Sequence, residues 1–213
     1  PYFVTDKNKM TSEFKKPYIL LADRDFNSIH DLMKPLEMCL DSGRPILVVA
    51  NDIAGDALQG LVLNKVKGSL RVCAIKSPGF GAARHDMLLD LQSVVGGTII
   101  TQSYDFNDFK IEDFGTCEKV IIHKNMSMII TNNQHGNQEN INSRIESIKS
   151  RMEEKYSLES EEMSVLKYRL QQLSGGIAIL RVGAATESEL IERYDRVDDA
   201  LNATRAALQE GIL

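Results

Sequence analysis

The segment SPGFGAARHD (77–86) has the spacing in this sequence that comes closest to a known chemical motif. Gly79 and Gly81 follow an apolar run and precede a helical pattern, where a dinucleotide-binding loop has its first two glycines. Arg84 stands where the third glycine of that loop belongs. A pair of glycines at such a point more often only turns a strand into a helix. The motif therefore supports cofactor binding weakly.

Metal and hydrolytic sites have less support still. The histidines lie far apart, with no His or Cys neighbours at the spacing of metal ligands: His30, His85, His123 and His135. Neither a Gly-x-Ser-x-Gly motif nor a Walker A loop is present. We expect no metal ion, no cofactor and no self-contained catalytic site in this chain.

Two helical segments carry more apolar residues than one buried face requires, since a surface helix usually needs a single stripe about 100° wide. Segment 54–67 has one stripe of Ala57, Leu61 and Val66, a second of Leu58 and Val62, and a separate Leu63. Segment 28–42 also has apolar residues on more than one side: Leu32, Met33, Leu36, Met38, Cys39 and Leu40.

This apolar excess has two interpretations. Both helices are sandwiched between a sheet and other elements, or they lie side by side and their outward stripes border a shared apolar groove. Such a groove would mark an interaction site. Its polar rim would consist of Lys34, Glu37, Asn64 and Lys65.

An acidic residue near the C-terminus is a further candidate. Asp199 lies two positions from Val197 and two from Leu201, which places it roughly 200° from the apolar side of a helix. It therefore points away from whatever that helix packs against. By itself the pattern is typical of a solvated acid on a charged helix.

The composition is that of a globular chain. Its 213 residues are 43% hydrophobic and 26% charged, which suits one or two domains with a real core. A net charge of −5 argues against a general nucleic-acid binder. No apolar run approaches the ~20 residues of a membrane helix, and no signal-peptide pattern opens the chain.

The cysteines bear on the cellular compartment of the protein, and the first residue bears on whether the chain is part of a longer one. Cys39, Cys73 and Cys117 are odd in number and widely spaced, which predicts reduced thiols in a cytoplasmic compartment. The chain begins with Pro1 in place of a methionine. We therefore interpret it as part of a longer protein.

The elements that position these residues alternate between strands and helices as far as residue 101. The segments 28–42, 54–67 and 82–95 are each long enough for a helix. Fully apolar strands joined by helices predict an α/β fold, with a parallel sheet, right-handed crossovers and helices outside it. The predicted strands are 18–22, 45–50, 70–76 and 97–101.

The second half of the chain has a different pattern. Strands at 119–124 and 127–131 are close enough to form a hairpin. Beyond the polar segment 132–140, apolar residues three and four apart predict two helices that pack as an antiparallel hairpin. Ser160 is the expected N-cap of the second helix.

The C-terminal segment begins after this helical hairpin. Gly175 and Gly176 precede a strand predicted at 177–183. One long helix follows, and Thr186 and Glu189 at its start have capping-box spacing.

Seven stretches of the chain together resemble the group I chaperonins, the GroEL type. They are PYF, KPYILLADRDFNSI, SGRPILVVANDIAGDALQGLVLNKVKG, KSPGFGAARHDMLLDLQ, GGTIIT, LSGGIAILRVGAATESE and RVDDALNATRAALQEGI. The resemblance covers essentially the whole chain. It implies an apical domain at 1–174 and the C-terminal segment of an intermediate domain at 175–213. The equatorial ATPase domain would lie outside this chain.

The resemblance also implies a function. The helices at 32–42 and 54–67 would line the mouth of a ring cavity and bind exposed apolar segments of non-native polypeptides. The mobile loop of a GroES-type co-chaperonin would dock in the same groove. The implied binding residues are Tyr2, Phe3, Met33, Leu36, Leu58, Val62, Leu63 and Asn64.

Further roles follow from the same resemblance. Asp199 corresponds to an aspartate that promotes ATP hydrolysis, Gly175 and Gly176 to a hinge, and Glu187 to an inter-subunit salt bridge. The longer protein would be a cytoplasmic ring homo-oligomer that uses ATP and Mg, without nucleic-acid or membrane partners. This chain alone would not be an ATPase.

Several departures from the family pattern predict a divergent bacterial paralogue. Ala82 and Ala83 replace an acidic and a basic residue, and Lys34 and Pro35 replace an apolar pair. The segment 132–140 is rich in Asn and Gln where the family is acidic. From the residues alone, two other functions stay open: an α/β nucleotide-binding enzyme domain, and an adaptor that binds one fixed peptide partner.

Overall fold

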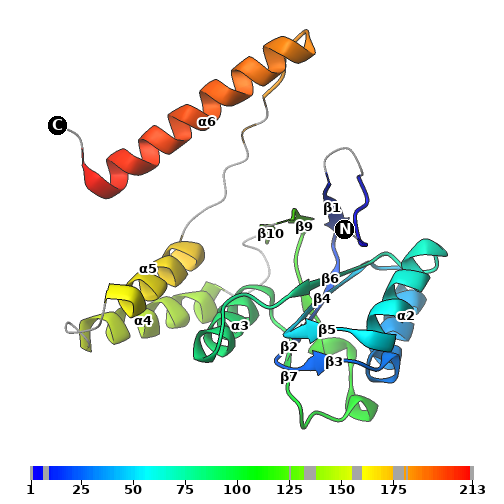
Figure 1. The fold of residues 1–213 in the computed structure, drawn as a ribbon. Coiled ribbons are helices and arrows are strands. Elements are labelled where there is room, and N and C mark those ends of the chain that lie inside the picture. Colours follow the sequence, from blue (N-terminus) through cyan, green and yellow to red (C-terminus); the bar gives the residue numbers. More distant parts are fainter. Residues whose placement is uncertain are drawn as a thin grey trace. The chain divides into compact units, whose positions relative to one another are not determined.

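The apolar runs predicted as strands form a parallel sheet in the first of two structural units (Figure 1). These units are Pro1–Gly175 and Gly176–Leu213. The structure is a computed structural model, and it describes residues 2–6, 10–124, 126–131, 138–154, 160–174, 180 and 182–211. The apical and intermediate identities expected for the two parts of the chain stay predictions.

The order of elements follows the predicted alternation. The strands are β1 (Ser12–Lys15), β2 (Tyr18–Ala22), β3 (Asp25–Phe26), β4 (Ile46–Ala50), β5 (Asp52–Ile53), β6 (Val72–Lys76), β7 (Ile99–Ile100), β8 (Gly115–Thr116), β9 (Lys119–Ile122) and β10 (Ser127–Ile130). The 3-10 helices are η1 (Ile29–Leu32), η2 (Phe106–Asp108) and η3 (Ile111–Asp113). The α-helices are α1 (Met33–Ser42), α2 (Gly55–Val66), α3 (Ala82–Val95), α4 (Gln138–Glu154), α5 (Ser160–Ser174) and, in the second unit, α6 (Glu187–Glu210).

The central sheet has the order β6–β4–β2–β7, with parallel pairing throughout. Its register places Leu20 opposite Val48 and Val48 opposite Ala74. Every residue of β2 and β4 is buried, as expected for strands covered on both faces. β8 pairs antiparallel with β2, and β3 pairs with β5 in a short parallel extension. The predicted α/β class is confirmed.

The direction of each crossover decides which face a helix covers. The chain steps from β2 to β4 to β6 through α1 and α2, then returns past β2 to β7 through α3. Right-handed crossovers in opposite directions put their helices on opposite faces of the sheet. Accordingly, α1 and α2 lie on one side of the sheet and α3 on the other (Figure 1).

A second, antiparallel sheet has the order β1–β9–β10. The hairpin predicted between 119–124 and 127–131 is confirmed as β9 and β10. β1, which the sequence analysis did not predict, pairs along the other edge of β9. Its residues alternate, with Ser12 and Phe14 buried and Glu13 and Lys15 exposed, as the period of a strand requires.

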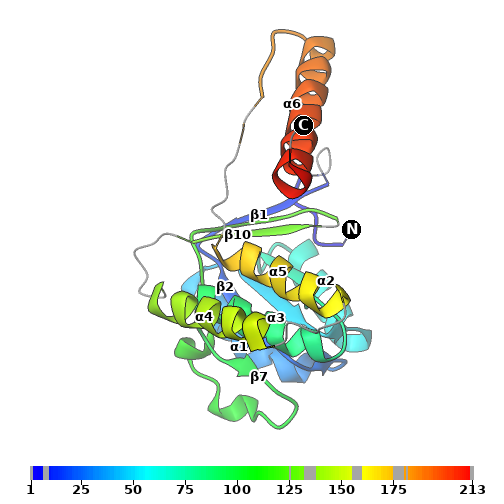
Figure 2. The ribbon, with the colours of Figure 1, turned by 90° about the vertical axis from the view of Figure 1, so that its left-hand side faces the viewer.

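The helical hairpin predicted after residue 140 is confirmed. Helices α4 and α5 run side by side in opposite directions and pack against α3 (Figure 2). Asp86 and Asp90, one turn apart on α3, accept hydrogen bonds from three arginines of the hairpin. These are Arg144 and Arg151 on α4 and Arg169 on α5.

The segment 28–42 differs from the single predicted helix. It begins as the 3-10 turn η1, whose Ser28 side chain accepts the backbone N–H of His30, and continues as α1 from Met33. Pro35 explains the division, because it has no N–H to donate to the carbonyl four residues earlier. Pro35 therefore lies in the first turn of α1, where such a donor is not needed.

Two predicted strands also changed. The strand at 97–101 is reduced to β7, because Gly97 has a φ of +79° and lies so close to β8 that a Cβ would be 2.4 Å from the backbone N of Gly115. Of the strand predicted at 177–183, residues 177–179 and 181 fall outside the described residues. Residues 180, 182 and 183 do not form a strand.

The second unit contains the predicted C-terminal helix, α6. The Thr186 hydroxyl oxygen accepts the backbone N–H of Glu189 at 3.3 Å, and the Glu189 carboxylate accepts the backbone N–H of Ala185 at 3.2 Å. The reciprocal bond thus reaches one residue before the N-cap. It satisfies backbone groups at the helix start as a capping box does.

Candidate polypeptide-binding groove

Helix α2 is placed by one apolar stripe that faces the sheet. Ala57 and Leu61 are fully buried there. Gly60 lies against η1, where a Cβ would come within 2.7 Å of the Cδ1 atom of Ile29. The small residue thus lets α2 pack closely on η1. The side of α2 opposite the sheet is left to face solvent.

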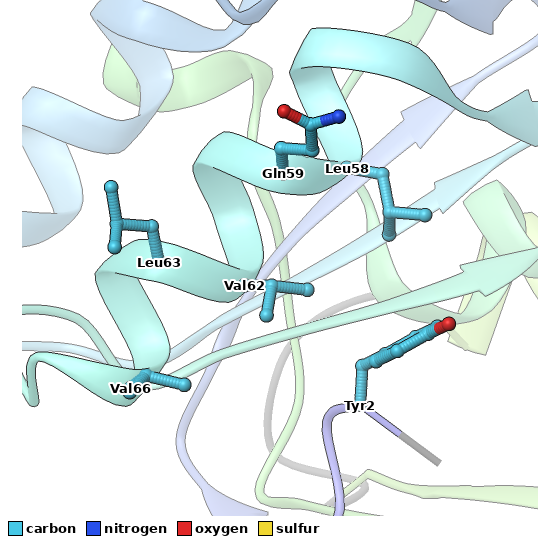
Figure 3. Close-up of a pocket in the computed structure, with 6 residues that line it drawn as sticks. All are labelled: Tyr2, Leu58, Gln59, Val62, Leu63 and Val66. Atoms are coloured by element: carbon cyan, nitrogen blue, oxygen red, sulfur yellow. The ribbon is translucent and has the colours of Figure 1, made fainter.

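The second apolar stripe of α2 faces an open pocket of about 380 Å³. Leu58 and Val62 lie one turn apart and face this space together with Tyr2 (Figure 3). Val66 extends the stripe by another turn. Gln59 and Leu63, also one turn apart, complete the lining. The pocket is therefore a groove between an apolar helix face and an aromatic ring.

The lining is only partly covered by the rest of the chain. Leu63 is 52% exposed, Val66 is 77% exposed, and Leu58 and Val62 are half-buried. Large exposed apolar side chains that adjoin one another are typical of interaction sites. Among the described residues, the sandwiched alternative does not hold for α2.

The N-terminal segment forms the second wall of the groove. Tyr2 is 62% exposed, whereas the neighbouring Phe3 is buried. The Lys65 ammonium group on α2 donates hydrogen bonds to the carbonyl oxygens of Tyr2 at 2.9 Å and Val4 at 2.7 Å. The segment 2–4 is thus attached to the helix that it faces.

Helix α1 contributes less to this groove than the sequence predicts. Met33 is 44% exposed but does not line the pocket, and Leu36 is buried in the core. The Lys34 ammonium group donates to the backbone carbonyl of Asn107, which holds α1 to the loop that contains η2. We correct the assignment of Leu36 to the binding surface, because its side chain supports α1 from beneath.

Two further predicted residues have supporting positions. Phe3 is buried and anchors the N-terminal segment in the core, so its ring does not reach the groove. The Asn64 side-chain amide donates to the carbonyl oxygen of Gly60 at 2.9 Å, and Asn64 does not line the pocket. Both residues position the groove without lining it.

Gln59, Val66 and the anchoring role of Lys65 are not among the predicted binding residues. Val66 shares a predicted stripe with Ala57 and Leu61, but it also follows Val62 by one turn, and this spacing connects it to the groove. The sequence predicts Lys65 only as a rim residue; its hydrogen bonds to the N-terminal segment have no sequence signal, because the partners lie about 60 residues away.

A family model described as the TCP-1/cpn60 chaperonin family matches residues 30–213. The chain belongs to this family. The match includes all of α1 and α2, the helices assigned by resemblance to the mouth of a chaperonin ring. Family and fold together support a chaperone role.

Solved structures of a chaperonin have the same fold. The chain is similar to chaperonin gp146 from the bacteriophage EL 2 (Pseudomonas aeruginosa), crystallised in the presence of ATP-BeFx. For crystal form II, the TM-score is 0.72 and the identity 19%, over 100% of this chain and 42% of gp146. For crystal form I, the values are 0.65 and 20%, over 100% and 41%. The chain thus spans about two-fifths of that protein's length.

The second unit of this chaperonin chain carries the other predicted site residues. Asp199 is exposed on α6, away from the half-buried Val197, and it has no partner among the described residues that would fix its carboxylate. Glu187 is exposed in the first turn of α6. The predicted hinge residues Gly175 and Gly176 lie outside the described residues.

The glycine pair that suggested a cofactor has a structural role. Gly79 and Gly81 both have positive φ values, +81° and +56°. A Cβ at Gly79 would lie 2.8 Å from the sulfur of Met87 and 3.3 Å from the backbone N of Arg84. The turn therefore packs directly on the first turns of α3, as the simpler interpretation predicts.

A polar cluster joins the carboxyl ends of three strands to α3. Asn51 donates to Asp23 at 3.0 Å, Ser77 donates to Asn51 at 2.9 Å, and His85 Nδ1 lies 2.8 Å from the Asp23 carboxylate. The hydrogen bond from Asn51 and the contact with His85 hold the pKa of Asp23 below its usual value. Because the Ser77 hydroxyl bonds to an amide and not to His85, this cluster does not form an activated nucleophile.

The other reactive groups are covered or dispersed. Burial raises the pKa of Cys39 and Cys117 to about 12 and of Cys73 to about 11, so these thiols stay protonated. Among the residues that the structure describes, no three His, Cys, Asp or Glu side chains gather as a metal site. None of the described helices has the length and apolar character needed to cross a membrane.

Proposed function

We propose that this chain captures exposed apolar segments of non-native polypeptides in the groove between α2 and Tyr2. The observation that carries the proposal is the solvent-open apolar stripe of Leu58, Val62 and Val66 opposite an aromatic ring. Membership of a chaperonin family makes a non-native polypeptide the expected ligand. By the same resemblance, the mobile loop of a GroES-type co-chaperonin competes for this groove.

The groove should bind each segment weakly and with little sequence preference. A fully buried Leu or Val side chain contributes ~1.5–3 kcal/mol, so three or four half-buried ones give ~4–6 kcal/mol before the cost of association. A single groove then has a dissociation constant of roughly micromolar to millimolar. Because the lining offers few hydrogen-bonding groups, the apolar content of a client should matter more than its order.

The longer protein supplies the remaining steps of the proposed cycle. A ring of identical grooves would raise avidity without new contacts. ATP and Mg, bound outside this chain, would bias movement of the apical part about Gly175 and Gly176. Asp199 would promote hydrolysis, Glu187 would pair with a neighbouring subunit, and the ring would act in the cytoplasm.

Paired substitutions in the groove test the proposal. Leu58→Ser with Val62→Ser should weaken binding of a short, unstructured, leucine-rich fluorescent peptide by about tenfold or more, measured by anisotropy. The control is Leu40→Ser with Ile111→Ser, because these exposed apolar side chains lie outside the groove. Control affinity should equal that of the parent.

A scrambled version of the peptide separates this function from a fixed adaptor role. Scrambling keeps the apolar content and should leave the dissociation constant unchanged within about threefold, a difference below 1 kcal/mol. Strong preference for one order would support the adaptor. Unchanged binding by the folded Leu58→Ser/Val62→Ser variant would show that the groove is not the binding site.

A further inference from the structure

The groove needs two walls, and only one of them belongs to α2. A single helix presents a convex surface, so Leu58, Val62 and Val66 by themselves form a stripe without a hollow. The opposing wall is the ring of Tyr2, which comes from a segment about 60 residues away in the sequence. Whatever holds Tyr2 in place therefore determines whether the hollow exists.

Two contacts hold the residues next to Tyr2. The buried Phe3 side chain anchors the segment in the core. Lys65 bonds to the carbonyl oxygens of Tyr2 and Val4, the residues on either side of Phe3. Hydrogen bonds from a charged donor are about twice as strong as neutral ones.

Lys65 is not a freely solvated lysine. Its side chain is half-buried, and burial lowers its pKa from the usual value. A partly desolvated ammonium group is costly unless it is hydrogen-bonded, and the two carbonyl oxygens meet that requirement. The neighbouring Lys67 is exposed, with no such side-chain contact among those the structure describes.

We propose that Lys65 is a positioning residue for polypeptide binding: by bonding to the carbonyls of Tyr2 and Val4, it holds the Tyr2 ring as the second wall of the groove. This inference rests on the proposed function. Lys65 acts through Tyr2 and does not itself touch the captured side chain. Loss of the ammonium group leaves the apolar stripe of α2 intact but frees Tyr2 to move away from it.

A tryptophan at position 2 reports the wall directly, because the chain contains no tryptophan. In the Tyr2→Trp protein, Lys65→Met should increase acrylamide quenching of the indole by up to about 1.6-fold, because the side chain at position 2 is 62% exposed and its release would expose the rest. Lys65→Arg retains charged donors and should restore the quenching of the Tyr2→Trp protein. Lys67→Met is the matched control and should leave quenching unchanged.

Peptide affinity provides the second measurement. With Tyr2 present, Lys65→Met should weaken binding of the leucine-rich peptide roughly 2- to 12-fold, the range of one aromatic contact. In the Tyr2→Ala background, the same substitution should change affinity less than about twofold, because the wall is already absent. Damage to α2 itself would weaken binding equally in both backgrounds.

The possible results separate this inference from the function on which it rests. If the parent binds no peptide, the proposed function fails, and quenching still decides whether Lys65 places Tyr2. If the parent binds but Lys65→Met changes neither quenching nor affinity, the positioning role is overturned. An equal loss of affinity with Tyr2 and with Ala at position 2 also overturns it.

Discussion

Arg169 on α5 holds Asp90 on α3 at two points: its Nε lies 2.6 Å from one carboxylate oxygen and its Nη2 3.0 Å from the other. Both side chains are buried, and 79 residues separate them in the sequence. The pair therefore ties the helical hairpin to the α/β part of the first unit.

Removing Arg169 should leave Asp90 with one guanidinium partner in place of two, because Arg144 Nε also donates to Asp90 at 2.7 Å. Arg169→Leu is expected to lower the free energy of unfolding by about 1.5–3 kcal/mol, the contribution of a hydrogen bond to a charged group, measured by urea denaturation. The control is Lys76→Ala, which breaks the exposed pair with Asp52 and should cost less than about 1 kcal/mol. Equal effects of the two substitutions would contradict a structural role for the buried pair.

The neighbouring Asp86 predicts how stability depends on pH. Burial by itself would raise its pKa, but the hydrogen bond from Arg151 and the charges of Arg169 and Arg151 bring the pKa below its usual value. The unfolded pKa is about 3.9, so ionised Asp86 stabilises the fold above about pH 4. This contribution is lost as the pH falls through the lowered pKa of the folded state.

The urea midpoint should accordingly fall as the pH drops from about 5 to about 3. Asp86→Asn removes the titrating group and should make this fall shallower, although the variant is less stable at neutral pH. A pH dependence as steep as that of the parent would show that Asp86 does not contribute to it.

The lack of a side chain at Gly60 determines how closely α2 can pack against η1. Gly60→Leu introduces a good helix former, so a loss of stability would come from the clash with Ile29 and not from helix propensity. Overpacking of this kind costs about 1–3 kcal/mol in the free energy of unfolding. Ile29→Ala in the same protein should recover part of that loss, as measured by a double-mutant cycle. Additive effects would mean that the two residues do not interact.

Nucleotide binding distinguishes the proposed chaperone function from the enzyme alternative. We expect calorimetric titration of this chain with MgATP to give only heats of dilution. Arg84 stands in place of the third glycine of a dinucleotide-binding loop, and the sequence has no Walker A loop. Stoichiometric binding that Gly79→Ala abolishes would instead support a nucleotide site in this loop.

The local patterns of the sequence were sufficient for much of the fold. Fully apolar runs identified β2 and β4, and helical spacing identified α2 and α3 to within a residue. Their alternation implied the parallel sheet. The two stripes on 54–67 also indicated that this helix has a second apolar face. These features depend on side-chain period along a few turns or strands, which a sequence displays directly.

Only the tertiary structure decided which apolar residues are open to solvent. Leu36 and Phe3 match binding positions by resemblance, yet they are buried, whereas Val66, which shares a predicted stripe with the buried Ala57 and Leu61, is exposed. The spacing of apolar residues places them on a common face of a helix or strand, but it does not show which other element covers that face. The covering of Leu36 and Phe3 depends on how separate elements pack against one another, and the spacing of apolar residues does not show that packing.

The groove itself is also a feature that only the tertiary structure decided. Leu58 and Val62 could be paired from their spacing, but their opposing wall, Tyr2, is held by Lys65 through backbone carbonyls. Every residue has a backbone carbonyl, so the residue types do not indicate which carbonyls accept such a hydrogen bond. The sequence by itself determined an apolar helix face, and the folded chain brought a second wall to it, because a hollow requires two segments that only tertiary contacts bring together.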